Sequence, residues 1–244
     1  MKNFDLLRTA VSRLGTLYVR RLCAREFKKQ IYNGTNERPI EFSFLFRELV
    51  ELWPIKILDV GTGMTALPHL MRNCGFHVTA TDNINDYWPA GMVNSHYHVI
   101  NDDITDTKIS ETFDAITCIS VLEHIQAHAQ AMRSMYKLLK PGGRLMLTCP
   151  YNEKHYVPNV YKLPESSVRE EFPFVTQSFS SNEVDSWLSD SPFTLLKQDY
   201  WRFFEGEFWT CGGALPKPMQ VGPDSRHKLS CMVLSRPEND SSSG

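Results

Sequence analysis

Residues 57–65 read Ile57-Leu-Asp-Val-Gly-Thr-Gly-Met-Thr65, an apolar run that ends in two glycines at alternate positions. A buried strand that enters such a turn and then a helix lets a ligand lie against bare backbone at the helix N-terminus. Asp82 follows about 20 residues later, at the end of the next apolar run, where a carboxylate binds ribose hydroxyl groups. The stretch therefore predicts a nucleotide or nucleoside site within an α/β fold.

Short apolar runs recur along the chain with helical stretches between them, and this alternation is typical of a parallel sheet. The strands are predicted at residues 55–60, 76–81, 113–119, 144–149, 193–200 and 228–235. The helices are predicted at residues 3–31, 41–52, 64–74, 125–140 and 180–188, the first of them amphipathic.

The same pattern predicts the domain organisation. Residues 1–53 are expected to be an N-terminal helical segment, 54–236 the main domain, and 237–244 a disordered polar tail. Two stretches interrupt the main domain, at about 151–180 and at 202–227, and they are too long for plain connections in a compact domain. We expect them to act as a lid or as binding loops.

Composition narrows the classes of partner. The chain has 244 residues, of which 26 are Lys or Arg and 28 are Asp or Glu, and the net charge is −2. A general nucleic-acid or anionic-membrane binder usually has a basic excess, so neither partner is expected. The apolar runs are shorter than the roughly 20 residues of a membrane span, and the start of the chain lacks a signal-peptide core. We expect a cytoplasmic protein without stable membrane insertion. The six cysteines form no CxxC pair, so no disulfide or zinc site is predicted.

Asp59 distinguishes between two ligand classes that use such a glycine loop. The spacing also satisfies a dinucleotide fingerprint, so a nicotinamide cofactor is the alternative. A carboxylate two residues before the first glycine repels a diphosphate and attracts the ammonium group of an amino acid. The charge therefore favours S-adenosylmethionine over NAD.

With these motifs in place, the sequence resembles the class I S-adenosylmethionine-dependent methyltransferases, whose first motif is an acidic residue, any residue and then alternate glycines. Thr81-Asp82 resembles their second motif, Asn-Asp-Asp-Ile at 101–104 the third, and residues 113–125 the fourth. Residues 138–147 resemble the helix-to-strand turn that follows. Thr65 departs from the pattern, because a third glycine is common there. The resemblance covers most of residues 55–150.

The resemblance implies a doubly wound, seven-stranded, mostly parallel sheet with helices on both faces and an antiparallel last strand at residues 228–235. It also implies a set of cofactor-binding residues. They are Asp59, Gly61, Thr62, Gly63, Asp82, Asn83, Asp103, Ile104 and Ser120. Asp103 is assigned to adenine, with Asp102 as the alternative.

Methyl transfer to oxygen or nitrogen chiefly needs alignment, and needs a base only where the acceptor proton is not freely lost. His124, directly after the strand at 113–119, is the first candidate base, and a structural histidine is the alternative. Glu123 and His155 are further candidates. His124 and His128 stand four residues apart, but no third ligand follows at a recognisable spacing, so no metal is predicted.

Residues 201–213 concentrate aromatic side chains beside two glutamates, a composition suited to stacking on sugars or lipid-like acceptors. A satellite hydrophobic core or a homodimer contact is the alternative. We therefore expect the acceptor to be a small molecule or a glycan precursor. For the whole chain, the alternatives are an inactive binding or scaffolding protein of the same fold, and an aminopropyltransferase-like enzyme.

Overall fold

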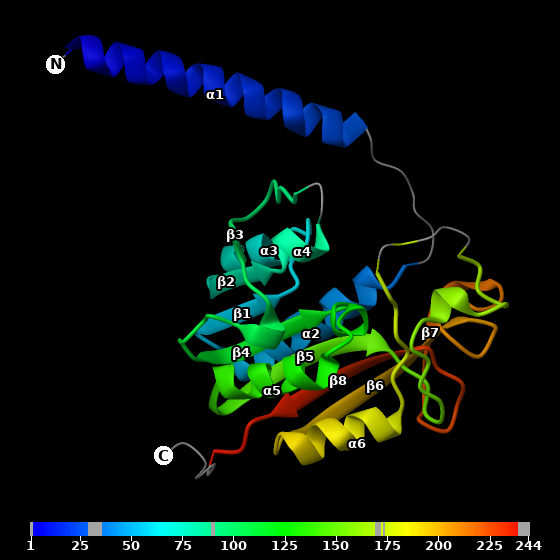
Figure 1. The fold of residues 1–244 in the computed structure, drawn as a ribbon. Coiled ribbons are helices and arrows are strands. Elements are labelled where there is room, and N and C mark those ends of the chain that lie inside the picture. The colour runs from blue at the N-terminus through cyan, green and yellow to red at the C-terminus, as the bar shows by residue number, and fades with distance from the viewer. Residues whose placement is uncertain (1, 29–35, 89–90, 169–171, 173, 239–244) are drawn as a thin grey trace. The chain divides into compact units, whose positions relative to one another are not determined.

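Within the residues that the computed structural model describes, namely 2–28, 36–88, 91–168, 172 and 174–238, the strands form one eight-stranded sheet (Figure 1). Its strand order is β3-β2-β1-β4-β5-β8-β6-β7. The strands are β1 Lys56–Val60, β2 His77–Asp82, β3 Val99–Asn101, β4 Phe113–Ile119, β5 Leu139–Pro150, β6 Thr194–Phe204, β7 Ala214–Val221 and β8 Leu229–Ser235. The first five pair in parallel, and β8 pairs antiparallel with both β5 and β6. The predicted mostly parallel sheet with an antiparallel strand at 228–235 is thus confirmed.

The strand count differs from the predicted seven because β7 lies inside the stretch that the sequence analysis treats as the second insertion. β6 runs on to Phe204, and β7 returns beside it as an antiparallel hairpin at the sheet edge. Pro216 and Pro218 lie within β7. Proline cannot donate to a strand ladder, so it is confined to edge strands and weakens the strand signal in the sequence.

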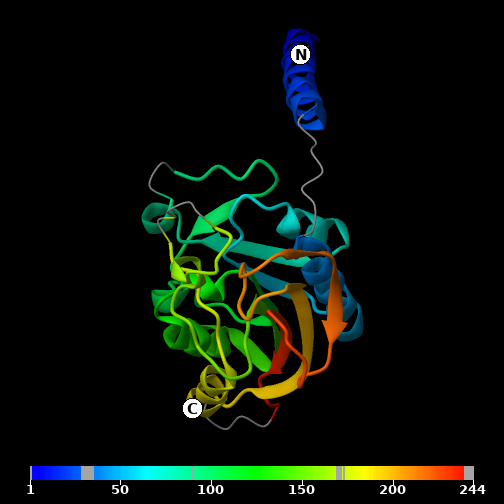
Figure 2. The same cartoon turned by 90° about the vertical axis from the view of Figure 1, so that its right-hand side faces the viewer.

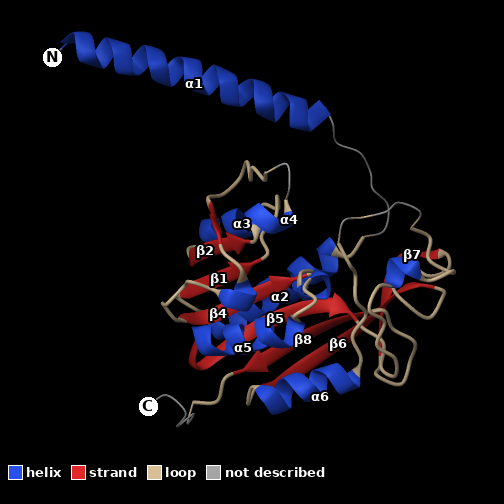
Figure 3. Ribbon diagram, in the orientation of Figure 1, coloured by secondary structure: helices blue, strands red, loops and turns tan. Residues whose placement is uncertain are grey.

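Helices complete the architecture (Figure 3). They are α1 Lys2–Lys28, α2 Arg38–Leu52, α3 Leu67–Asn73, α4 Ile84–Tyr87, α5 His128–Leu138 and α6 Ser181–Asp190, with single 3-10 turns η1 Ile104–Asp106, η2 Leu122–His124 and η3 Val160–Lys162. The chain divides into two compact units at 36/37. α1 belongs to the first unit, whereas α2, which the sequence places in the N-terminal segment, belongs to the second. No helix in the described ranges has the length and apolarity that a membrane crossing requires.

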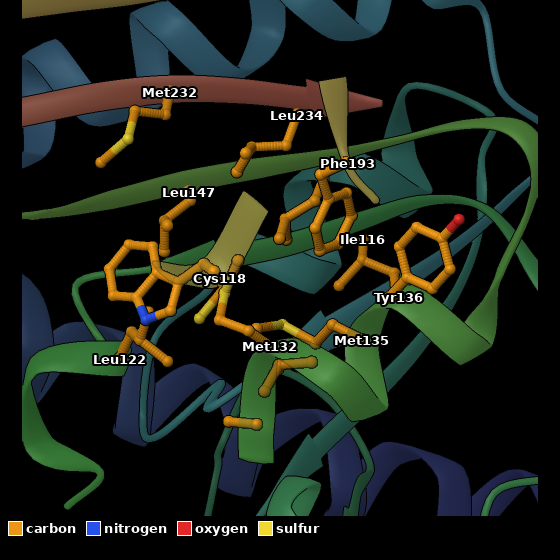
Figure 4. Packing of buried hydrophobic residues seen from close by; sticks show 14 of the residues in the cluster. Ile116, Cys118, Leu122, Met132, Met135, Tyr136, Leu147, Phe193, Met232 and Leu234 are labelled. Atoms are coloured by element: carbon orange, nitrogen blue, oxygen red, sulfur yellow. The ribbon is translucent and has the colours of Figure 1, made fainter. Parts of the chain in front are cut away.

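Alternate strand residues face two separate hydrophobic cores, one on each side of the sheet. Leu58 and Ile116 point into the core beneath α5 and α6, and Ile57 points into the core beneath α2 and α3. Figure 2 shows the two helical layers on opposite sides of the strands. Figure 4 shows Met132 and Met135 of α5 beside Ile116 and Cys118 of β4, with Leu147 of β5 and Met232 and Leu234 of β8 in the same cluster. Period-two alternation of apolar side chains therefore produces the doubly wound arrangement.

The start of α6 follows its predicted signal. Ser180 is the N-cap residue, its backbone N–H donates to the Glu183 carboxylate at 2.9 Å, and the two residues form a capping box. The helix then buries Val184 and Trp187, which belong to the core beneath α5 and α6. The predicted helix at 180–188 is confirmed.

The aromatic residues of the second predicted insertion pack inward. Phe203 is buried, and Trp209 lies edge-on to both Phe203 and Phe204 with ring centroids 5.2 Å apart. All three belong to, or pack against, the core beneath α2 and α3. These side chains extend a hydrophobic core, which is the alternative interpretation of that stretch.

Candidate active site

A cavity of about 620 Å³ opens at the carboxyl ends of the central strands, where ligands bind in open α/β sheets. The residues predicted to bind the cofactor all lie in its wall. They are Asp59, Gly61, Thr62, Gly63, Asp82, Asn83, Asp103, Ile104 and Ser120. The structure therefore brings to one place residues that the sequence spreads over four strand ends.

The glycine loop between β1 and α3 forms the floor of the cavity. Gly61 has a φ of +71° and Gly63 a φ of +55°, a backbone region that other residues rarely adopt. A Cβ atom on Gly61 would lie 2.3 Å from Val121 Cγ1, so the loop packs directly against the segment after β4. Only glycine fits this position.

Asp59, at the end of β1, is a buried carboxylate, 2% exposed. Its two oxygens accept hydrogen bonds from the hydroxyl groups of Thr62 and Thr117, each at 2.6 Å. Burial is the main reason that the pKa of Asp59 rises to about 6, and the negative charge of Asp82 adds to this rise. A cation in the cavity would lower this pKa and bind the ionised form.

Asp82, at the end of β2, connects the glycine loop to the segment that follows β2. Its carboxylate accepts the backbone N–H of Gly63 at 2.7 Å and the indole N–H of Trp88 at 3.1 Å. Burial raises the pKa of Asp82, although these hydrogen bonds act against the rise. Trp88 also lines the cavity and is a residue that the sequence reasoning missed.

Both carboxylates proposed for the adenine contact line the cavity after β3. Asp103 accepts the backbone N–H of Thr105 at 2.8 Å and the side-chain amide of Asn83 at 3.3 Å. Asp102 accepts the hydroxyl of Thr107 at 2.6 Å. The Asp103 carboxylate is thus hydrogen-bonded to Asn83, the residue directly after Asp82. The Asp102 carboxylate is instead hydrogen-bonded to Thr107, in the loop that leaves the site.

Arg38 brings α2 into the wall of the cavity and Glu41 holds it there, and sequence reasoning missed both. Glu41 is fully buried and accepts hydrogen bonds from Ser120 Oγ at 2.5 Å and Thr148 Oγ1 at 2.7 Å, at the ends of β4 and β5. Its other oxygen pairs with Arg38 at 3.0 Å. This network holds the Arg38 guanidinium at the cavity, close enough to Asp59 to lower that pKa.

One sequence signal points to Arg38. A cation in the first turn of a helix is unfavourable for the helix dipole, and Arg38 is the first residue of α2. Such a placement is consistent with a role outside the helix itself.

His124, in η2 after β4, lines the cavity. Its Nδ1 lies 2.7 Å from the backbone carbonyl of Val175, and its ring meets Phe174 edge-on at 4.9 Å. Burial is the first cause of its lowered pKa, so the ring is neutral near pH 7. With the Nδ1 proton directed at a carbonyl, Nε2 is the unprotonated nitrogen of the neutral ring.

The other two candidate bases do not line the cavity. Glu123 is buried, its Oε1 lies 4.0 Å from His124 Nε2, and within the described chain its Oε2 has no hydrogen-bond partner. Burial raises its pKa well above the ordinary value, which favours the protonated form of this carboxyl group. His155 is exposed and does not line the cavity. His128 accepts the indole N–H of Trp187 at 3.0 Å and packs among aromatic rings.

Several large apolar side chains also line the cavity. Phe42 comes from α2, Met64 from the glycine loop, Ile125 from the end of η2, and Phe174 from the first predicted insertion. The insertion at 151–180 therefore contributes Phe174 to the wall of the cavity. In the described part of the chain, no three His, Cys, Asp or Glu side chains are grouped to hold a metal ion.

Comparison with protein families and curated proteins gives matches to methyltransferases. A family model described as a methyltransferase domain matches residues 18–198, more than half of the chain. The ubiquinone biosynthesis O-methyltransferase of Aeromonas salmonicida is 27% identical over 129 residues, which cover 49% of this chain and 53% of that protein. The enzyme of the same name from Pseudomonas entomophila is 31% identical over 120 residues, which cover 45% and 51%. The chain spans about half the length of the curated relatives it matches.

Solved structures show the same fold. A 1,6-didemethyltoxoflavin-N1-methyltransferase from Burkholderia thailandensis, crystallised with S-adenosylhomocysteine, matches with a TM-score of 0.54 and 14% identity over 93% of this chain and 89% of that one. An S-adenosylmethionine-dependent methyltransferase from Clostridium acetobutylicum matches with a TM-score of 0.53 and 13% identity over 90% and 99%.

Proposed function

Since the chain belongs to the methyltransferase-domain family, we propose that it transfers a methyl group from S-adenosylmethionine to an oxygen or nitrogen atom of a small molecule. The observation that carries this proposal is the cavity wall, where Arg38 and Asp59 present opposite charges beside the glycine loop. An α-amino acid carries one carboxylate and one ammonium group, so this pair complements its charges. We also propose that residues 37–236 form the catalytic domain.

The wall fits the other parts of the cofactor. The Asp82 carboxylate, which has about four acceptor sites in all, would accept the ribose hydroxyl groups. Asp103 and the backbone of Ile104 would contact adenine. Glu41 would act as a positioning residue, because it holds Arg38 by an ion pair. When bound, the cofactor supplies a methyl group activated by the positive charge on its sulfur.

His124 would serve as the base. Its Nδ1 proton faces the Val175 carbonyl, so Nε2 would accept the proton that an acceptor hydroxyl or ammonium group loses. The lowered pKa keeps Nε2 unprotonated near neutral pH. Glu123 is buried outside the cavity lining and its pKa is raised, so it would act as a positioning residue beside His124 Nε2, 4.0 Å away, rather than as the base.

The lining favours an acceptor with an apolar or aromatic body. Phe42 and Phe174 both line the cavity, and Phe174 meets the His124 ring edge-on. The aromatic residues that pointed to a sugar acceptor belong to a hydrophobic core, so they do not support that choice. The curated relatives are named as O-methyltransferases, which supports oxygen as the methylated atom.

Cofactor binding is tested by calorimetry with S-adenosylmethionine and S-adenosylhomocysteine. We expect Asp82→Ala to weaken the Kd about 10- to 100-fold, since a hydrogen bond to a charged group contributes about 1.5–3 kcal/mol. Asp106→Ala is the matched control, because this carboxylate is exposed in η1 and outside the cavity. Failure of the unaltered chain to bind either ligand would favour an inactive protein of the same fold.

Methyl transfer is tested with labelled cofactor and a panel of phenols, amines and nucleotide sugars. We expect label on a hydroxylated aromatic compound. His124→Ala should lower kcat while the cofactor Kd stays within about twofold. His155→Ala is the control outside the cavity and should retain kcat. Full turnover by His124→Ala would assign this histidine a structural role.

A further inference from the structure

α1 exposes a row of large apolar side chains. Every side chain described in this helix is exposed, and the row recurs at three- and four-residue spacing. Its exposed fractions are Leu7 63%, Val11 62%, Leu14 67%, Tyr18 66% and Leu22 39%. Helices of globular proteins usually bury such a stripe, and exposed apolar patches mark interaction surfaces.

The charge of α1 is opposite to that of the rest of the chain. Its 27 residues include seven Lys or Arg and two acidic residues, a net charge of +5. Because the whole chain carries −2, the remainder carries −7. The nearly neutral total therefore conceals one strongly basic helix. Arg13 and Arg20 lie on the half of the helix circumference opposite the apolar row, whereas Arg8 lies beside the row.

The apolar row argues against self-association as a coiled coil. A seam of alternating three- and four-residue steps runs through Val11, Leu14 and Tyr18, and its next two positions are Arg21 and Arg25. Two parallel copies would place these like charges against each other at the core positions. An anionic surface has no such conflict, because arginines at one end of the row can reach its charged groups while the apolar side chains enter it.

We propose that α1 binds the surface of an anionic lipid bilayer, with the row from Leu7 to Leu22 in the acyl-chain boundary and with Arg8, Arg21 and Arg25, beside and at the end of the row, against the headgroups. A basic amphipathic helix of 20–30 residues lies in the plane of such a surface without crossing it. The proposal concerns the first unit alone and does not depend on the proposed methyl transfer.

Vesicle co-sedimentation of the full chain tests the proposal. We expect binding to vesicles of phosphatidylcholine mixed with phosphatidylglycerol, and little binding to phosphatidylcholine alone. Raising the salt from about 0.1 M to about 1 M should release the protein, because the screening length falls from about 10 Å to about 3 Å. Equal binding to both vesicle types, or no binding to either, would overturn the proposal.

Matched variants separate the contributions of the apolar row and of the basic residues to vesicle binding. Leu7→Gln with Leu14→Gln should weaken binding about tenfold or more, since two apolar side chains are lost from the row. Thr9→Gln with Thr16→Gln introduces the same side chain on the other face and should bind normally. Arg21→Gln with Arg25→Gln should weaken binding to the anionic vesicles by about fivefold per charge, because these two arginines lie at the end of the row. Equal binding by all three variants would contradict the proposal.

Two further measurements keep the result interpretable. Each variant should retain the thermal transition and the cofactor Kd of the unaltered chain, which shows that the second unit is folded. Sedimentation of the free protein at increasing concentration tests whether a second copy of the chain, rather than a membrane, binds the apolar row of α1. A dimer that Leu7→Gln with Leu14→Gln dissociates would identify a second copy of the chain as the partner and overturn the membrane assignment.

Discussion

Substituting alanine for Gly61 or Gly63 of the glycine loop tests the packing described for the candidate site. Both positions have a positive φ, but they differ in the space around them. A Cβ on Gly61 would lie 2.3 and 2.5 Å from the two γ carbons of Val121, whereas a Cβ on Gly63 would find Trp88 Cζ2 at 3.8 Å. Gly61→Ala therefore combines backbone strain with a steric clash, and Gly63→Ala adds strain alone.

The magnitudes follow from these two contributions. A positive φ costs a non-glycine residue about 1–2 kcal/mol, of which about 0.4–1 kcal/mol is offset by the reduced freedom of the unfolded chain. Overpacking adds about 1–3 kcal/mol for Gly61→Ala. We expect a loss of about 2–4 kcal/mol of unfolding free energy for Gly61→Ala and about 1 kcal/mol for Gly63→Ala. The corresponding decreases in Tm are about 4–16 °C and about 2–4 °C.

Thermal and urea denaturation measured by circular dichroism give these values. Val121→Ala removes both γ carbons and leaves the Cβ at 2.9 Å, so part of the clash remains. The double variant Gly61→Ala with Val121→Ala should be about 1–2 kcal/mol more stable than the sum of the single effects predicts. Equal losses for the two glycine variants, or strict additivity in the double variant, would refute the packing argument.

Two predictions concern the charged pair in the cavity wall. Because burial holds the pKa of Asp59 near 6, the Asp59 carboxylate of the free protein binds a proton below that pH. The affinity for S-adenosylmethionine should therefore rise as the pH increases from about 5 to about 7 and then level off. Since this pKa is higher in the folded than in the unfolded chain, the unfolding free energy of the free protein should decrease as the pH rises from about 4 to about 6. Asp59→Asn should flatten both profiles, measured by calorimetry and by urea denaturation; an unchanged slope would show that another group titrates. Arg38→Met should weaken S-adenosylmethionine binding about 10- to 100-fold through loss of a charge-assisted hydrogen bond, yet leave 5′-methylthioadenosine, which has no carboxylate, nearly unaffected; equal loss for both ligands would indicate damage to the nucleoside site.

The local features of the site could be predicted from the sequence. Short-range spacing predicted the places of Gly61, Gly63, Asp59 two positions before the first glycine, and Asp82 at the end of the next strand. Each lies in the cavity wall. The capping residues of α6 are equally local, because Ser180 and Glu183 are three residues apart.

Averages over the whole sequence concealed other features. The net charge of −2 argues against an anionic surface as a partner, whereas α1 taken alone carries +5. β7 escaped prediction because its two prolines are turn-forming residues in most contexts, and only its pairing with β6 shows it as an edge strand.

The sequence by itself determined the alternation of strands and helices, the glycine loop and the carboxylates at the strand ends, because spacing along the chain encodes backbone conformation and strand order brings these ends together. Tertiary packing alone decided which distant side chains complete the site. Glu41 reaches Ser120 and Thr148 across 79 and 107 residues of chain, and thereby carries Arg38 to the cavity. The same packing brought Phe174 beside His124 and left His155 exposed. These contacts depend on how α2 and the loop after β5 pack at the sheet, and no spacing within either segment specifies that.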